Sequence, residues 1–188
     1  HGFLLLYQPL QIENQVPLER DVRIEGVDFA KGTPLATKYG FSFWRASWLY
    51  RLKASPRVQA DLGASLQIRN ADISFVSGDG KQGVSQRNIG PVPLVKGRLR
   101  VGPERGWWWG AEADGMYAPI SYLNGSDNEV VGAILDLSLR GGLRTERDVD
   151  VFLNLRYLGG GATGESDDGY NRNWLHFLTL SLGLGVAP

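Results

Sequence analysis

Apolar and polar residues alternate along most of this chain. The longest such stretch covers residues 58–69, in which every position obeys the alternation. Its apolar members are Val58, Ala60, Leu62, Ala64, Leu66 and Ile68, and its polar or small members are Gln59, Asp61, Gly63, Ser65, Gln67 and Arg69. A period of two residues puts the two sets on opposite faces of a β-strand. The stretch is therefore predicted to be a strand with one apolar and one polar face.

The same period recurs in further segments and predicts an all-β protein. These segments are 44–52, 95–101, 109–117, 131–139, 149–157 and 174–186, which with 58–69 makes seven strands. A weaker eighth strand is predicted at 3–12, where Pro9 interrupts the pattern because proline cannot donate a hydrogen bond to a sheet. Residues 22–29 also have extended character, and whether they lengthen the wall of a barrel stays open.

The predicted connections alternate in length. Short turns are expected at 54–56, 102–106 and 141–147, and long loops rich in Gly, Asn, Asp and Ser are expected at 13–40, 76–89, 118–129 and 159–172. Short turns on one rim and long loops on the other are typical of outer-membrane barrels.

The charges are confined to one face of the predicted strands. That face carries Arg45, Arg51, Asp61, Arg69, Lys96, Arg98, Arg100, Glu112, Asp114, Asp136, Arg140 and Arg156. The apolar faces of the seven strands hold His176 as their one ionisable residue. A charge at the middle of a lipid-facing surface costs about 2–4 kcal/mol, so this separation favours a membrane barrel over a soluble barrel with a ligand pocket. The charged residues are predicted to form an ion-pair network in the lumen.

Composition and aromatic positions agree with this interpretation. Arg outnumbers Lys by 15 to 5, and guanidinium groups suit fixed ion pairs. Aromatic residues gather toward strand ends and are predicted to lie at the membrane interfaces: Trp44, Trp48, Trp109, Tyr157 and Trp174. The formal net charge is zero and Cys is absent, so we expect no nucleic-acid partner, no metal and no cofactor.

In strand number, loop asymmetry and lumen charges, the chain resembles the small outer-membrane barrels typified by the transmembrane domain of OmpA, by OmpX and by the lipid A modifying barrels PagL and PagP. The resemblance implies an eight-stranded antiparallel up-and-down transmembrane β-barrel, one domain over residues 1–188, with periplasmic turns and extracellular loops. It also implies a monomer in the outer membrane of a Gram-negative cell envelope, with membrane lipids and lipopolysaccharide as partners. Such proteins usually end on an aromatic residue, whereas this sequence ends Val186-Ala187-Pro188.

Three functional hypotheses follow. An eight-stranded barrel is just wide enough to be filled by its own side chains. The leading hypothesis is therefore a non-enzymatic barrel with a plugged lumen, acting structurally or binding a surface ligand through its outer loops. The second is a lipid A or phospholipid hydrolase that uses His176, because PagL-type enzymes have a lipid-facing His two residues before a Ser. Here Leu178 occupies that Ser position. The third is a barrel that binds or transports a small molecule.

Overall fold

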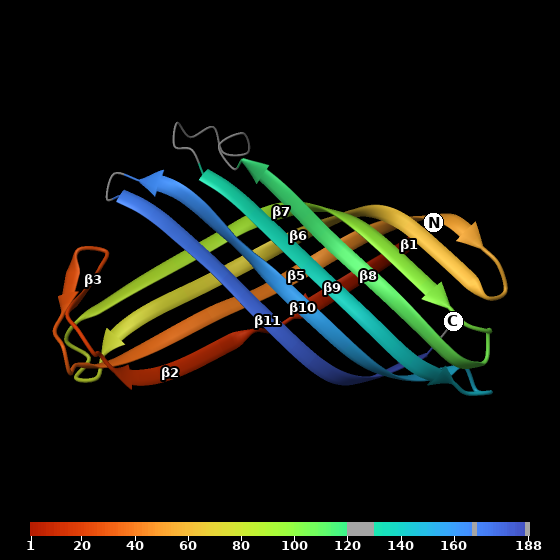
Figure 1. The fold of residues 1–188 in the computed structure, drawn as a ribbon, viewed down its shortest axis with the longest axis horizontal. Helices are drawn as coiled ribbons and strands as arrows, with labels where there is room; N and C mark the ends of the chain where they lie inside the picture. The colour runs from red at the N-terminus through yellow and green to blue at the C-terminus, as the bar shows by residue number, and fades with distance from the viewer. Residues whose placement is uncertain (120–129, 167–168, 187–188) are drawn as a thin grey trace. The chain divides into compact units, whose positions relative to one another are not determined.

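The computed structural model describes residues 1–119, 130–166 and 169–186, and it builds them from strands and turns (Figure 1). The strands are β1 (Gly2–Gln8), β2 (Gln11–Pro17), β3 (Val22–Ile24), β4 (Val27–Phe29), β5 (Pro34–Ala54), β6 (Val58–Ser77), β7 (Gly83–Val101), β8 (Gly106–Pro119), β9 (Val130–Arg144), β10 (Val149–Ser166) and β11 (Gly169–Val186). Within these described ranges, no helix has the length and hydropathy needed to cross a bilayer.

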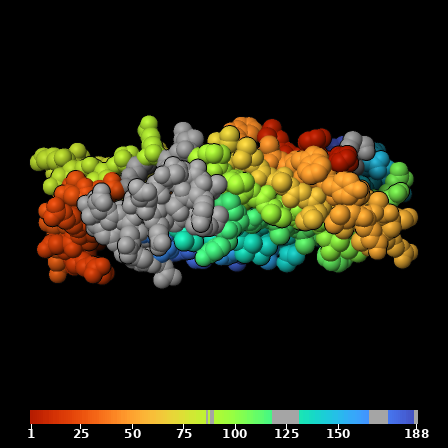
Figure 2. Space-filling view, turned by 90° about the horizontal axis from the view of Figure 1, so that it is seen from above, coloured from red at the N-terminus to blue at the C-terminus, as the bar shows by residue number. Residues whose placement is uncertain are grey.

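The main sheet is antiparallel and follows the chain order. Its strands are arranged β1-β5-β6-β7-β8-β9-β10-β11, and β2 also pairs with β5. The prediction of an all-β, antiparallel, up-and-down fold is confirmed. In Figure 2 the green residues of β8 lie next to the cyan residues of β9, in agreement with the pairing of these two strands.

The N-terminal strand is interrupted where the sequence places Pro9. β1 ends at Gln8 and β2 begins at Gln11, and both pair with β5. The carbonyl of Leu10 still accepts a hydrogen bond from the backbone N–H of Phe41. The two segments therefore act as one broken strand, as the missing N–H of proline requires.

Residues 22–29 form a separate hairpin. β3 and β4 pair only with each other among the described strands, through a turn at Glu25 and Gly26 with φ of 48° and 80°. This segment is therefore not part of the main sheet.

The prediction of long loops is wrong in three places. Residues 34–40 already belong to β5, β6 and β7 are joined by a tight turn over 78–82, and β10 and β11 extend through most of 159–172. The strands are longer than predicted because backbone pairing needs no apolar side chain. Gly, Asn and Ser continue a strand when a neighbour supplies hydrogen-bond partners. The remaining long loop, at 118–129, lies almost entirely outside the described residues.

The short turns are found where the sequence predicts them. The turn between β7 and β8 uses Gly102 and Gly106 with φ of 144° and 100°, values that residues with a Cβ rarely adopt. The turn between β9 and β10 lies at 145–148, because β9 continues to Arg144.

The chain divides into two compact units, which are described separately. One comprises residues 1–3, 47–65 and 93–188, and is called the β8–β11 unit below. The other comprises 4–46 and 66–92 and buries Phe29, Leu35 and Phe43. In this second unit Arg45 lies over the Phe43 ring, 5.1 Å from its centroid.

The sheet is strongly curled within the β8–β11 unit. Arg100 on β7 reaches to 3.8 Å from Asp150 on β10, three strands away. Neighbouring strands are about 4.8 Å apart, so three strands would span about 14 Å in a flat sheet. The polar face is therefore the concave one.

The strand order ends at β11, and the ring of strands is not closed. Among the described pairings, β11 is bonded to β10 alone. The outward residues of β11 are strongly exposed, with Leu178, Leu180, Leu182, Leu184 and Val186 between 71% and 78%.

Candidate functional site

The concave face of the β8–β11 unit carries clusters of paired charges. In the first, the buried carboxylate of Asp61 on β6 accepts hydrogen bonds from Arg51 on β5 and from Arg98 on β7. Arg98 reaches Asp61 at 2.8 and 2.9 Å. One carboxylate thus holds two cations from the strands on either side.

A second cluster joins β7, β8 and β9. The Lys96 ammonium lies 2.7 Å from Asp114 and 3.1 Å from Glu112, and Arg140 bonds to the other oxygen of Glu112 at 2.8 Å. The hydroxyl of Ser65 donates to Asp114 at 2.7 Å. Lys96 and Asp114 are almost completely buried, so their charges depend on these contacts.

A third cluster is a two-pronged pair between β9 and β10. Arg156 donates to both oxygens of Asp136, at 2.7 and 2.6 Å. This fork geometry is among the strongest contacts available to a guanidinium group.

A fourth cluster lies near the turns that join β7 to β8 and β9 to β10. Its Arg100 was predicted from the sequence to face the lumen, whereas Arg144 and Trp108 were not. Asp150 accepts hydrogen bonds from Arg144 and from the indole N–H of Trp108, and Arg100 lies 4.7 Å from the centroid of the Trp108 ring. Arg144 was overlooked because 141–147 was expected to be a turn. Extending the period of two from Asp136 through Arg140 would have placed Arg144 on the same face.

Two predicted lumen residues belong to the other unit. The buried Arg45 donates to the side-chain oxygen of Gln67 at 3.0 and 2.6 Å. Arg69 is half-buried, and its Nε has no hydrogen-bond partner among the described residues.

Four of the predicted interfacial aromatics lie on the convex face of the β8–β11 unit, and Trp44 belongs to the other unit. Trp44, Trp48 and Trp109 are exposed, whereas Tyr157 and Trp174 are half-buried. Trp174 donates its indole N–H to the hydroxyl of Thr163, at 3.0 Å.

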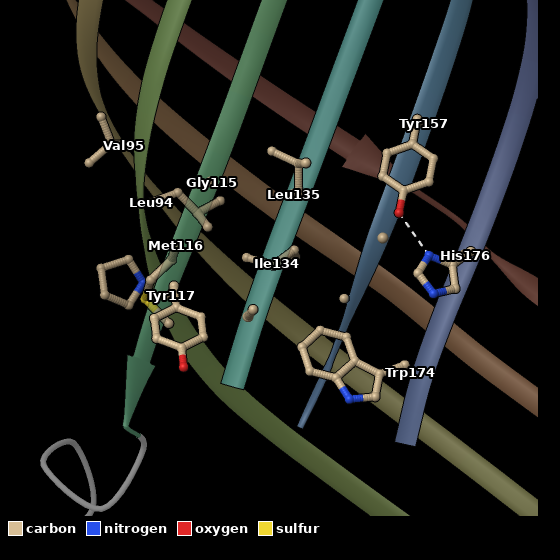
Figure 3. A pocket seen from close by; sticks show the side chains of 14 residues that line it. Leu94, Val95, Gly115, Met116, Tyr117, Ile134, Leu135, Tyr157, Trp174 and His176 are labelled. Carbon is tan, nitrogen blue, oxygen red and sulfur yellow. Dashed lines mark hydrogen bonds between the residues drawn. The ribbon is translucent and has the colours of Figure 1, made fainter. Parts of the chain in front are cut away.

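His176 lies on the same convex face and is bonded to Tyr157. The Tyr157 hydroxyl is 2.7 Å from Nδ1 of His176, and Figure 3 shows the two side chains facing each other from β10 and β11. His176 pairs across the sheet with Gly159, two residues beyond Tyr157. A Cβ at Gly159 would come within 2.3 Å of the Tyr157 hydroxyl, so the contact requires glycine at this position.

This pair lines a groove of about 830 Å³. Tyr117 and Trp174 stand at its sides (Figure 3), and its lining includes three residues with little or no side chain, Gly115, Ala133 and Gly159. The sequence analysis singled out His176, Tyr157 and Trp174 separately, but it did not join them into one site.

The contact that the structure shows for the His176 ring is a hydrogen bond with Tyr157. Its partner is a phenol rather than a Ser hydroxyl, and no group of three or more His, Cys, Asp or Glu side chains in the described part of the chain could hold a metal. Comparison of the chain with protein-family models, with curated proteins and with solved structures gave no match.

Proposed function

We propose that this chain is an integral β-barrel protein of a bacterial outer membrane, with a structural or surface-binding role. The observation that carries the proposal is the reversed placement of polar and apolar side chains. Leu62, Leu139 and Leu155 are 43–58% exposed on the convex face, whereas Asp61 and Ser138, each beside one of them in sequence, are 6% and 7% exposed.

A bilayer accounts for this distribution better than water does. An apolar surface this extensive is unfavourable in water and is uncommon on soluble monomers. In hydrocarbon it carries no such cost, and the charges then belong in the interior with partners. A soluble barrel would place its apolar residues inside.

We further propose that the ring closes in the membrane by pairing of β1 with β11. Counting β1 and β2 as one broken strand, the main sheet offers eight strands, an even number that makes the first and last antiparallel. Unpaired backbone groups at a sheet edge are costly in hydrocarbon, which provides the driving force for closure. Both termini would then lie on the rim that carries the turns after β5, β7 and β9, the periplasmic one. Membrane lipids with lipopolysaccharide would surround the barrel.

The role is proposed to be passive because the concave face is filled by ion pairs. Two alternatives have direct tests. A hydrolase using His176 would change the mass spectrum of lipid A between cells expressing the wild type and His176→Ala, and a conducting barrel would give channel currents in planar bilayers. We expect identical spectra and no discrete conductance.

The membrane location is tested by placing a charge on the convex face. Leu139→Arg is expected to lower the free energy of unfolding in lipid vesicles by about 2–4 kcal/mol. Pro56→Arg, in the exposed turn between β5 and β6, is the matched control and should change little. If Leu139→Arg costs no more than the control, the convex face does not lie in lipid and the proposal fails.

A further inference from the structure

We infer that the groove at Tyr157 and His176 binds one acylated lipid of the surrounding bilayer, with His176 donating a hydrogen bond to an acyl carbonyl. This inference rests on the proposed function, because the groove opens on the convex face that we place in the membrane.

The polar pair borders an apolar surface. On the side toward the C-terminal end of β11, its outward neighbours are Leu153 and Leu155 on β10 and Leu178 and Leu180 on β11. A hydroxyl and an imidazole facing hydrocarbon are unfavourable unless they are hydrogen-bonded. Their mutual bond satisfies the Tyr157 hydroxyl and Nδ1 of His176. The second ring nitrogen of His176, Nε2, takes no part in this bond.

Nε2 determines which chemical group a ligand of the groove must offer. When the Tyr157 hydroxyl donates to Nδ1, the ring proton is on Nε2, which becomes a donor. A donor in apolar surroundings requires an acceptor. The carbonyl of an ester-linked or amide-linked acyl chain is the acceptor that a bilayer supplies next to hydrocarbon.

The volume of the groove and its level in the proposed bilayer agree with a bound acyl chain. Its volume of about 830 Å³ lies within the range of small-molecule sites, and Gly115 and Ala133 put little or no side chain into it. Trp174 lies two residues before His176 on β11, about 7 Å along the strand. Because membrane-protein Trp residues gather at the headgroup level, the pair lies at about the depth of acyl carbonyls.

The test compares an ester lipid with its ether analogue, which lacks the carbonyl. The full chain is reconstituted with diacyl phosphatidylethanolamine or with its dialkyl ether, transferred to detergent, and examined for retained lipid by native mass spectrometry. The wild type should retain one ester lipid about three- to ten-fold better than the ether lipid, which is the effect of one hydrogen bond. A parallel experiment with lipid A distinguishes which lipid supplies the carbonyl. It is needed because either an ester or an amide carbonyl can accept the hydrogen bond from His176.

Variants test whether the preference for the ester lipid over the ether lipid comes from the groove. His176→Leu and Tyr157→Phe should retain ester and ether lipids equally, and Gly159→Ala should do the same by displacing the Tyr157 ring. Leu182→Ala, outward on β11 but outside the groove, should keep the wild-type preference. Equal retention of both lipids by the wild type, or an unchanged preference in His176→Leu, overturns the inference.

Vesicle flotation separates this inference from the proposed function. If the wild type floats with vesicles but shows no preference for the ester lipid, the lipid site is wrong and the membrane location stands. If the wild type does not float, both proposals are overturned.

Discussion

At the scale of single residues, the identity of each side chain follows from the face it occupies. Along β9, Asp136, Leu137, Ser138 and Leu139 are 4%, 40%, 7% and 58% exposed. The charged and hydroxyl groups are buried and the leucines are open, the reverse of a soluble sheet. Stability at this scale therefore depends on charge pairing on one face and on close backbone approach at a few glycines.

Removing one member of a buried pair should be strongly destabilising. Asp136→Asn removes the carboxylate that binds Arg156 through both of its oxygens, in a site where both side chains are largely buried. We expect a loss of about 3–5 kcal/mol in the free energy of unfolding, measured with urea in lipid vesicles. The double change Asp136→Leu with Arg156→Met should recover part of this loss, because the two opposite charges are removed together. A single-variant loss below about 1 kcal/mol would show that the pair is solvated.

Two glycines of the β8–β11 unit should respond differently to alanine. A Cβ at Gly63 would lie 1.9 Å from the carbonyl oxygen of Trp48, whereas a Cβ at Gly97 would meet nothing within 4 Å. Gly63→Ala should destabilise the protein by about 1–3 kcal/mol or more, through overpacking against backbone. Gly97→Ala should be neutral or slightly stabilising, because glycine is unfavourable inside a strand. Equal urea midpoints for the two variants would contradict this packing.

At the scale of elements, the sequence predicts which segments are strands better than where they end. The period of two located the strands of the main sheet, and Pro9 marked the break between β1 and β2. The ends of β6, β7, β10 and β11 were missed, because their Gly-rich and Asn-rich extensions are held by pairing with a neighbouring strand. That pairing is a tertiary property, which local composition does not report.

The groove was missed for a related reason. The parity of the alternation puts Tyr157 and His176 on the apolar face, but their contact depends on the register that sets His176 opposite Gly159. It depends also on the missing Cβ at Gly159, which makes room for the Tyr157 hydroxyl. Neither the register nor the available space can be obtained from one strand alone.

The turn between β6 and β7 should respond to acid through Asp79. The hydroxyl of Ser77 and the backbone N–H of Lys81 bond to the Asp79 carboxylate, and they hold the pKa of Asp79 below its ordinary value. The stabilisation is present above the unfolded pKa of about 3.9 and is lost as the pH falls through the folded pKa. The amide NMR signal of Lys81 should titrate with a midpoint below about 3.9.

Two variants check the cause of that shift. Ser77→Ala removes the largest contribution and should raise the midpoint of Asp79, whereas Asp79→Asn should abolish the titration. An unchanged midpoint in Ser77→Ala would show that the hydroxyl does not stabilise the carboxylate.

At the scale of the whole molecule, the curl of the sheet and the open edge at β11 are two aspects of one architecture. Curling brings Arg100 within reach of Asp150 and buries the charges, while the strand order leaves β11 paired on one side only among the described pairings. A sheet that already buries its polar face needs only the pairing of its two end strands to remove every free edge.

Closure can be tested by cross-linking because the chain has no native Cys. Leu5→Cys on β1 is combined in turn with Leu180→Cys, Leu182→Cys or Leu184→Cys on β11, all outward positions. In vesicles, one register should form an intramolecular disulfide on mild oxidation, because facing residues of paired strands meet the distance that a disulfide needs. Leu5→Cys with Leu139→Cys is the control and should stay reduced, since β9 would lie three strands from β1 in the closed ring. If none of the three β11 partners cross-links in vesicles while the protein remains folded there, β1 and β11 do not pair and the ring stays open.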